Sequence, residues 1–569
     1  MSVTDNPIPP APRLRITAHE LLRDSKAGLS VAGLLLPQAL AYSSIANMPP
    51  QAGIMALFAG LVCYGLFGFS RFAIVSATSS SAIVLAAAIA SITAGRPEMQ
   101  MTMAAGLVMI TGVLFLMAGM AKMGNVTDFI AKPVLRGFTF GLAIVIIIKQ
   151  FAEIVGVRMP EASLFELAIA LSGKFNEWNQ ASIVTAAAAL GLLFFLERYK
   201  WLPGGVMVVI LGIIAGKWLN LSDHGVQIIG MINLELTAPS FPKITNAEWV
   251  QLGEVSLGLA FILYAESYGS IRNFAIKHGD PVLPNRDLLS LGICNLASGV
   301  LHGMPVGAGY SATAANEKHG ASSRFSGGIA ALVILPIVLL MMPTIALIPK
   351  PVLAAIVIHA VSHTLTIATF RPYFAWRRDH IVIVASVVAV LTLGVMEGLL
   401  VAVGISLFLL LRQMSAATVT QLGRHGRREH DFVNLQTFPK ATLIPGVIIL
   451  RPDQALFFAN ADRMMTKLRE QIAATDTSVH AVVLSLEQTT NLDSVVLEGL
   501  RDLTVYTTSL GKRLVLARVK DDVYQVLQHS IVPSQPTLGI SRLSVAHAVS
   551  LALAPETEDK DRDSDFSPG

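Results

Sequence analysis

Two short polar stretches interrupt long apolar ones: Ser76-Ala77-Thr78-Ser79-Ser80-Ser81 and Pro305-Val306-Gly307-Ala308-Gly309-Tyr310-Ser311-Ala312-Thr313. In hydrocarbon every backbone N–H and C=O group needs a partner, so irregular backbone persists there only where protein buries it or a wet cavity hydrates it. Secondary transporters place such interruptions at matching positions of two halves, with half-helix N-termini converging on an anionic substrate. This pair of interruptions therefore predicts a binding site built from two broken membrane helices, and both contain the tripeptide Ser-Ala-Thr.

The composition places the chain among membrane proteins. Of its 569 residues, 53% are hydrophobic and 14% are charged, and its mean hydropathy is +0.61, whereas about 25% of the residues of soluble proteins are charged. Charged residues are sparse from about residue 28 to residue 411 and dense afterwards, which marks a boundary between membrane and soluble parts. We expect a cytoplasmic N-terminal segment (1–23), a transmembrane domain (24–412), a linker (413–442), a soluble domain (443–554) and a disordered tail (555–569).

Apolar runs long enough to span a bilayer recur from Lys26 to Arg412. Twelve long runs and the two broken segments give fourteen expected spans. Lys and Arg concentrate in the loops that follow even-numbered spans, which predicts that both termini are cytoplasmic. The N-terminal segment lacks the short apolar core and cleavage site of a signal peptide. We therefore expect a multi-pass protein of the plasma membrane, the inner membrane in a bacterium, in contact with lipid.

Several motifs together resemble one family. The first predicted span reads Leu36-Pro37-Gln38-Ala39-Leu40-Ala41-Tyr42 and is followed by Met48-Pro49-Pro50-Gln51-Ala52-Gly53; later segments include Asn285-Arg286-Asp287-Leu288 and Ile348-Pro349-Lys350-Pro351. In order and spacing these segments resemble the sulfate permease (SulP) family of anion transporters over nearly the whole chain. The resemblance implies an all-α polytopic membrane domain of fourteen spans, arranged as a seven-plus-seven inverted repeat with two broken helices and divided into a core and a gate. It also implies a homodimer.

The chain after Pro445-Gly446 has a different pattern. Short β-rich runs at 447–450, 457–461, 481–486 and 513–517 alternate with helical stretches, which predicts a small α/β domain. The run 482–486 and the Leu492-Asp493-Ser494 that follows it resemble the STAS domain (sulfate transporter and anti-sigma factor antagonist). In soluble relatives a serine at the position of Ser494 is phosphorylated, so Asp493 and Ser494 are regulatory candidates. The alternative is that one of them caps a helix.

Glu266 follows Phe261-Ile262-Leu263-Tyr264-Ala265 in the mostly apolar span 255–271. An ionised carboxylate at that depth is costly, so it needs a partner or a proton. By resemblance, Glu266 occupies the place of an acidic residue in the eighth span that serves as the proton- or cation-coupling group. Ser270 lies four residues on and shares its helix face. The alternative is a structural carboxyl group hydrogen-bonded to neighbouring helices.

At the breaks, backbone N–H groups and the positive ends of two half-helices would hold an oxyanion. We assign the substrate shell to residues of the breaks and to two residues that share one face of the first span and match the family signature: Thr78, Ser79, Ser80, Ser311, Ala312, Thr313, Gln38 and Tyr42. Close helix packing is the alternative role for each small or hydroxyl residue.

Two positions depart from the family pattern. Many members of the family carry an arginine between two small residues of the second break, where this chain has Ser311-Ala312-Thr313. The Gly-Pro common at the first break is Ser76-Ala77 here. The missing cation leaves the identity of the anion open.

These observations favour a secondary active transporter of small anions, coupled to protons or sodium, with sulfate as the first candidate. The alternatives are a bicarbonate or C4-dicarboxylate transporter, and a membrane-tethered STAS regulatory protein without transport activity. The sequence contains no metal-ligand cluster, phosphate loop or nucleophile motif in a suitable context, so we expect no enzyme, no metal site and no cofactor. The net charge of +4 is a weak argument for a nucleic-acid partner, because basic residues of membrane proteins mainly set orientation.

Overall fold

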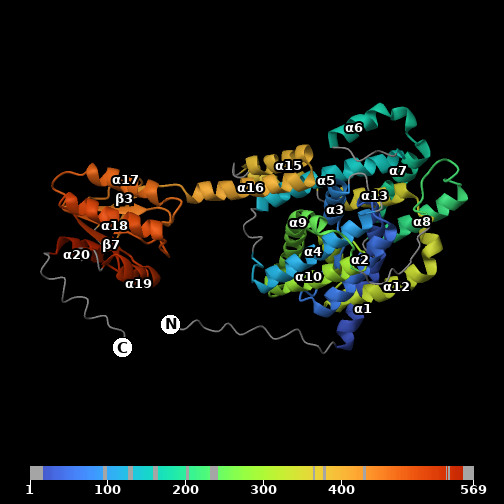
Figure 1. Cartoon of the computed structure of the whole chain (residues 1–569), viewed down its shortest axis with the longest axis horizontal. Helices are drawn as coiled ribbons and strands as arrows, with labels where there is room; N and C mark the ends of the chain where they lie inside the picture. Colours follow the sequence, from blue (N-terminus) through green and yellow to red (C-terminus); the bar gives the residue numbers. More distant parts are fainter. Residues whose placement is uncertain are drawn as a thin grey trace. The chain divides into compact units, whose positions relative to one another are not determined.

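The computed structural model describes residues 17–93, 99–125, 132–157, 164–199, 204–230, 241–362, 365–375, 380–426, 431–532, 535 and 538–554 (Figure 1). The chain divides into two compact units, Met1–Leu407 and Phe408–Gly569. Most of the expected N-terminal segment (residues 1–16) and the whole expected tail (555–569) lie outside the described residues. The first helix begins at Ala18, within the segment that we expected to precede the membrane domain.

The first unit contains helices and two very short strands, and its last helix continues past the boundary at Leu407 to Met414. In chain order these elements are α1 (Ala18–Ile45), α2 (Pro50–Phe67), β1 (Val75–Ser76), α3 (Ser79–Ile92), α4 (Gln100–Met120), α5 (Lys132–Val155), α6 (Leu164–Gly173), α7 (Gln180–Leu196), α8 (Gly204–Trp218), α9 (Asn246–His278), α10 (Pro284–Val300), β2 (Gly307–Ala308), α11 (Tyr310–Lys318), α12 (Phe325–Ile345), α13 (Lys350–Ser362), α14 (Arg371–Ala375), α15 (His380–Leu393) and α16 (Val395–Met414). Short 3₁₀ turns precede α7 (Phe175–Glu177) and α14 (Ile367–Thr369).

The packing pattern of helices α1 to α8 recurs in helices α9 to α16. α4 packs on α9 as α12 packs on α1, α4 packs on α10 as α12 packs on α2, and α5 packs on α15 as α13 packs on α7. The pairs α2 with α10 and α5 with α13 join equivalent helices of the two halves. The short α6 and α14 occupy equivalent places between longer helices, which leaves fourteen other helices of this unit among the described residues, in two sets of seven. Because seven is odd, the second set starts on the opposite side of the membrane from the first.

The same contacts separate a core from a gate. α1 to α4 and α9 to α12 pack among themselves, and α5, α7, α8, α13 and α15 form a second group. Contacts between the groups run chiefly through α1, which meets α8 and α13, and through α3, which meets α5. The broken helices belong to the core, so a movement of the core against the gate carries them as one body.

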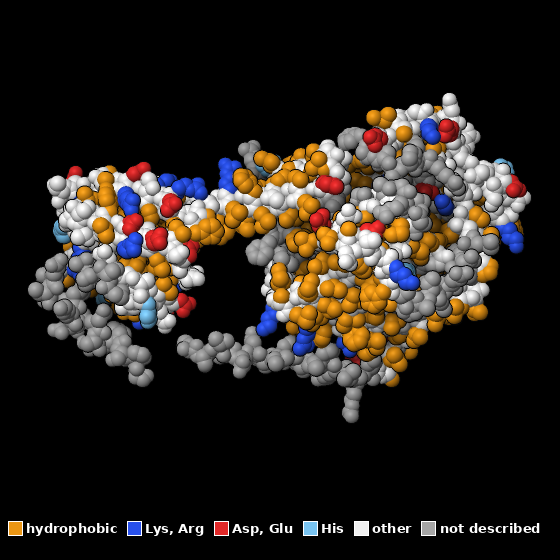
Figure 2. All heavy atoms as spheres, viewed as in Figure 1, with side chains coloured by type: hydrophobic (Ala, Val, Ile, Leu, Met, Phe, Trp, Pro, Cys, Tyr) orange, Lys and Arg blue, Asp and Glu red, His pale blue; other side chains and the backbone are white. Residues whose placement is uncertain are grey.

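The surface of the first unit suits a bilayer. Within the described residues, four helices are long and apolar enough to cross a membrane: α1, α2, α4 and the part Pro133–Val155 of α5. Seven shorter apolar helices of 10–17 residues accompany them. Many large hydrophobic side chains are exposed, including Leu340 and Leu332, and Figure 2 shows such side chains over much of the visible face of this unit. Exposure of this kind is typical of a lipid-facing surface.

The second unit is built around one six-stranded sheet with the strand order β4-β3-β5-β6-β7-β8. Its elements are β3 (Val419–Arg424), β4 (Phe432–Asn434), β5 (Val447–Pro452), α17 (Ala461–Ala473), β6 (Ala481–Ser485), α18 (Ser494–Ser509), β7 (Arg513–Ala517), α19 (Asp521–Ser530), β8 (Gly539–Ile540) and α20 (Val545–Leu553). The strands β5 to β8 are parallel, and β3 is antiparallel to both β4 and β5.

Alternation along the strands covers both faces of this sheet, because successive strand residues point to opposite faces. Ile448 and Leu450 pack with α17, α18 and α19, whereas Val447 and Ile449 pack with α20. The expected α/β domain therefore has a core on each side of its sheet.

Two expectations for this region differ from the structure. The segment 413–442, expected as a linker, supplies β4, the edge strand of the sheet, and β3 beside it. The mixture of polar and apolar residues in both strands gives no clear strand pattern. The run 457–461, expected as β-rich, is a turn that leads into α17. The N–H of Phe457 donates to the side-chain oxygen of Asn460 at 3.0 Å, so the backbone folds back locally and does not join a ladder.

Candidate functional site

The two breaks meet each other inside the core. β1 and β2 pair antiparallel, with Val75 opposite Ala308 and Ser76 opposite Gly307. The half-helices α3 and α11 begin directly after these strands, at Ser79 and Tyr310. Two strand residues from each half thus satisfy part of the broken backbone, and two helix N-termini start beside the point where the halves cross.

Glycines permit this close approach. A Cβ atom at Gly60 of α2 would lie 2.3 Å from the carbonyl oxygen of Val75 in β1. A Cβ atom at Gly307 would lie 2.7 Å from the hydroxyl of Ser267 in α9. Both distances are shorter than a van der Waals contact. A residue larger than glycine at either position would therefore push the break away from its neighbour.

Buried polar side chains secure the backbone on either side of the breaks. The side-chain amide of Asn295 in α10 donates to the carbonyl of Val306 at 2.8 Å, and its oxygen accepts from the N–H of Val306 at 3.0 Å. Ser267 accepts from the N–H of Ala308 at 2.9 Å. Asn316 of α11 donates to the carbonyl of Phe72 at 2.9 Å. None of these three polar residues was predicted, although an amide or hydroxyl within an apolar span was the available signal.

The N-terminus of α3 carries a reciprocal cap. The N–H of Ser81 donates to the hydroxyl of Thr78 at 3.2 Å, and the N–H of Thr78 donates to the hydroxyl of Ser81 at 3.0 Å. The hydroxyl of Ser81 also reaches the carbonyl of Pro305 at 3.2 Å, which ties the first break to the segment that leads into the second. Ser81 was not among the predicted site residues.

Glu266 of α9 lies against this same N-terminus. Its Oε2 atom accepts hydrogen bonds from the hydroxyl of Thr78, at 3.0 Å, and from the hydroxyl of Ser80. The two hydroxyls lie 2.9 Å from each other. An acceptor at this place is favoured by the partial positive charge of the helix terminus. The carboxyl group thus takes two of the hydroxyl donors that the sequence analysis assigned to the substrate shell.

The N-terminus of α11 is arranged differently. Its N-cap residue, Gly309, has no side chain and makes no side-chain hydrogen bond to the helix. Of the following residues, Tyr310 and Ser311 are exposed, and Ala312 is buried. Free N–H groups at a helix N-terminus attract anions, so this end of the pair presents backbone donors without a competing side chain.

α1 completes the surroundings of the site. It packs against both α3 and α11, as α9 does. Gln38 and Tyr42 on α1 are 5% exposed each. The symmetric helices α1 and α9 therefore flank the two half-helices from both repeats.

The remaining candidates differ in their contacts. The hydroxyl oxygen of Thr313 accepts from the N–H of Ile74 at 3.2 Å, a contact that supports the first break. Ser79 is half-buried at the start of α3. Ser270 is buried, and its hydroxyl has no hydrogen-bond partner among the described residues. Of the predicted residues, Thr78 and Ser80 are the ones whose hydroxyls donate hydrogen bonds to Glu266.

In the second unit, Asp493 is the N-cap residue of α18. Its Oδ1 atom accepts from the N–H of Val496 at 2.9 Å, and its Oδ2 atom accepts from the N–H of Phe458 at 2.6 Å. Ser494 is the first residue of the helix and is exposed. Among the residues that the structure describes, no group of three or more His, Cys, Asp and Glu side chains could hold a metal ion.

Comparisons with known proteins show the family and the domains of the chain. The model of the Sulfate permease family matches residues 21–389, and the STAS domain model matches residues 438–538. A probable sulfate transporter of Mycobacterium tuberculosis is 30% identical over 509 residues, which cover 89% of this chain and 90% of that protein. The chloroplastic sulfate transporter 4.1 of Arabidopsis thaliana is 26% identical over 530 residues, 89% of this chain and 76% of that protein.

Solved structures share the fold. Murine SLC26A9, an anion transporter in the inward-facing state, superposes with a TM-score of 0.88 at 21% identity, over 95% of this chain and 93% of that one. The transmembrane domain of the cyanobacterial bicarbonate transporter BicA superposes with a TM-score of 0.62 at 24% identity, over 68% of this chain and 99% of that one. The expected helical transmembrane fold with a C-terminal STAS domain is confirmed. The chain belongs to the sulfate permease family, a family of membrane transporters and not of enzymes.

Proposed function

We propose that this protein is a secondary active transporter that takes up a small oxyanion, with sulfate as the first candidate, together with a proton or sodium ion. The observation that carries the proposal is the meeting of two half-helix N-termini at the β1–β2 pair, with Glu266 hydrogen-bonded to the first of them. Relatives named as sulfate transporters, at 30% and 26% identity, support sulfate as the first substrate to test.

Glu266 and the transported anion would compete for the same hydrogen-bond donors, and this competition would couple anion binding to proton or sodium binding. Ionised Glu266 accepts the hydroxyl hydrogens of Thr78 and Ser80 and places a negative charge beside the site. An arriving oxyanion needs the same donors and is repelled by that charge. Protonation of Glu266 removes the charge and releases the hydroxyls, so the anion and the proton bind together. A sodium ion held by the carboxylate would neutralise it in the same way. Movement of the core against the gate would then expose the loaded site to the other side.

Bicarbonate is the second candidate substrate, and C4-dicarboxylates follow it. Ala312 is buried at the second break and brings no charge where many members of the family carry an arginine. A site without a fixed cation compensates a single negative charge more readily than two. The structural likeness to a bicarbonate transporter at 24% identity concerns the fold alone.

The test is uptake by the purified full chain in proteoliposomes. Radiolabelled sulfate, bicarbonate and succinate are offered under an inward proton gradient, an inward sodium gradient or neither, and each unlabelled anion is used as competitor. Concentrative uptake of one anion that needs one of the gradients supports the proposal. Absence of uptake for all anions under both gradients would overturn it and leave the regulatory alternative, in which the STAS domain is the active part.

We also assign the protein to the plasma membrane with both termini in the cytoplasm, on the basis of the Lys and Arg distribution. A homodimer is the expected assembly. Accessibility of single cysteines introduced at the termini measures the first assignment, and cross-linking in native membranes measures the second.

A further inference from the structure

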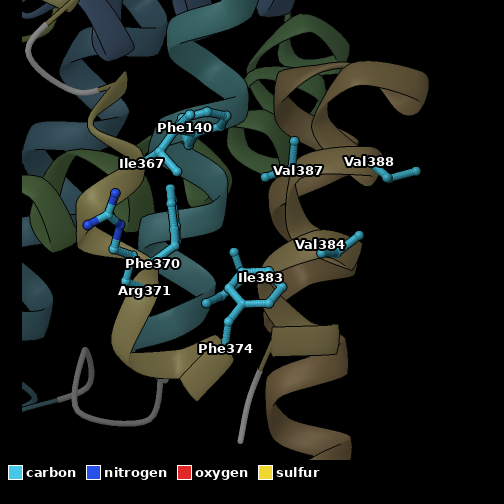
Figure 3. A pocket seen from close by; sticks show the side chains of 9 residues that line it. All are labelled: Phe140, Ile367, Phe370, Arg371, Phe374, Ile383, Val384, Val387 and Val388. Atoms are coloured by element: carbon cyan, nitrogen blue, oxygen red, sulfur yellow. The ribbon is translucent and has the colours of Figure 1, made fainter. Parts of the chain in front are cut away.

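An apolar groove opens on the gate, away from the breaks. It has a volume of about 410 Å³ and is lined by Phe140, Ile367, Phe370, Arg371, Phe374, Ile383, Val384, Val387 and Val388. Figure 3 shows residues of α15 on one side and Phe140, Phe370 and the neighbouring residues on the other. The rings of Phe140 and Phe370 meet edge to face at 5.2 Å. Val384 and Val388 remain about half exposed, so the walls are accessible from the surrounding hydrocarbon.

Basic side chains lie at the edge of this groove. In Figure 3, Arg371 lies on the side of Phe370 opposite to Val384 and Val388. Arg371 is exposed and forms no ion pair with any residue that the structure describes. Arg136 lies one helical turn before Phe140 on α5, is exposed, and stacks on Tyr373 of α14 with 5.3 Å between the guanidinium carbon and the ring centre. Among the described residues that line the groove, Arg371 is charged and none is acidic.

The groove sits where a lipid headgroup would be. Phe140 lies in the third turn of α5, and Ile383 to Val388 lie in the first turns of α15. With α6 and α14 left out of the count, α5 is the fifth span and α15 is the thirteenth. Both numbers are odd, so the two helices begin on the same side of the membrane. Arg136 and Arg371 belong to the Lys- and Arg-rich segments that the positive-inside rule assigns to the cytoplasmic face. The inner leaflet carries anionic lipids there, and basic pockets between membrane helices on that side bind their headgroups.

We propose that this groove binds one anionic phospholipid of the inner leaflet, with an acyl chain along the apolar wall and the phosphate at Arg371 and Arg136. A free inorganic anion would use the arginines but would leave the aromatic and valine side chains without a partner. The lipid would hold α14, a helix of five residues, against α5 and α15 and so stiffen the gate against which the core moves. Lipid binding at this groove does not depend on which anion is transported.

The test uses the full chain in liposomes of phosphatidylcholine that contain a small amount of a photoactivatable lipid, with a diazirine in its acyl chain and either a phosphatidylglycerol or a phosphatidylcholine headgroup. After illumination, peptide mapping locates the cross-links. We expect phosphatidylglycerol to label α5, α14 and α15 at the groove more strongly than phosphatidylcholine does.

Two variants and a control define the site. Arg371→Gln should lower phosphatidylglycerol labelling at the groove about fivefold, the factor that corresponds to about 1 kcal/mol per basic residue at an anionic leaflet, and should leave phosphatidylcholine labelling unchanged. Val384→Trp should fill the groove and lower labelling by both lipids. Arg198→Gln removes an exposed arginine after α7, outside the lining, and should change nothing.

Three results would overturn the proposal: equal labelling by both headgroups, labelling that Arg371→Gln leaves unchanged, or a loss of dimer cross-linking in Arg371→Gln and Val384→Trp without any effect on lipid labelling. The last result would mean that a second copy of the chain covers this face.

Discussion

The two breaks have the same architecture and different chemistry. Each consists of a two-residue strand followed by a half-helix, and both half-helices pack against the symmetric helices α1 and α9. The first break is capped by Thr78 and Ser81 and contacts Glu266, whereas the second begins at Gly309 with no side-chain cap. The repeat therefore supplies two helix N-termini, and one of them already contacts a carboxyl group of the protein. We infer that the first break senses the coupling ion and that the second holds most of the substrate.

Replacement of Glu266 by glutamine should have the largest effect, because it removes the charge that distinguishes the two breaks. We expect Glu266→Gln to abolish gradient-dependent accumulation, a loss on the order of tenfold or more, while exchange of labelled for unlabelled anion continues. The reason is that a neutral amide leaves the second break intact but responds to neither protons nor sodium. The measurements are concentrative uptake and counterflow in proteoliposomes.

Glu254→Gln is the matched control for this change, since Glu254 lies on the same helix and is exposed. It should behave like the unaltered protein. Unchanged concentrative uptake in Glu266→Gln would remove the coupling role from this residue.

Replacement of glycine by alanine tests how tightly each break packs against its neighbours. A Cβ atom at Gly60 would meet the backbone oxygen of Val75 at 2.3 Å, whereas one at Gly307 would meet the ends of the Ser267 and Leu263 side chains, at 2.7 and 2.9 Å. Side chains adjust more easily than backbone, so Gly60→Ala should destabilise the protein more than Gly307→Ala does. The expected cost is about 1–3 kcal/mol for the first. Thermal unfolding in detergent measures it.

Gly253→Ala serves as the control for both, because a Cβ atom there would meet nothing within 4 Å. If all three variants unfold at the same temperature, the breaks are seated less tightly than the distances indicate.

The breaks and Glu266 could be predicted because their physical signals are strong. A run of hydroxyl residues and a carboxyl group are costly in hydrocarbon, so each indicated a site through its residue types alone. The pairing of β1 with β2 could not be predicted in the same way, since two-residue strands leave no alternating pattern. The contact of Thr313 with Ile74 and the amide bonds of Asn295 depend on distant segments of the chain. Local composition does not encode such contacts.

A cation placed at the second break should sharpen its role as the substrate end. Ala312→Arg restores the residue type that many members of the family carry. A buried cation near the helix end should favour a doubly charged anion, and we expect the KM for sulfate to fall relative to that for bicarbonate on the order of tenfold, equivalent to about 1.4 kcal/mol. Competition uptake at fixed pH measures this ratio.

Ala312 is 3% exposed, so added volume alone could disturb the site. Ala312→Met supplies volume without charge and is therefore the control. Equal changes of the KM ratio in both variants would mean that packing, and not charge, sets the preference at this position.

Removal of a single hydroxyl should have the smallest effect. The effect should differ in kind between the two breaks. Hydrogen bonds donated to a carboxylate favour its ionised form, so loss of the Ser80 hydroxyl should let Glu266 take up its proton at higher pH. A hydrogen bond to a charged group contributes about 1.5–3 kcal/mol, and one pH unit corresponds to about 1.4 kcal/mol. Ser80→Ala should thus move the pH midpoint of uptake upward by about one to two units with little change in maximal rate.

Ser311→Ala, at the second break, should instead raise the KM and leave the midpoint in place. Uptake measured across a pH series at several anion concentrations separates the two effects, and a midpoint shift in both variants would show that both breaks respond to the same proton.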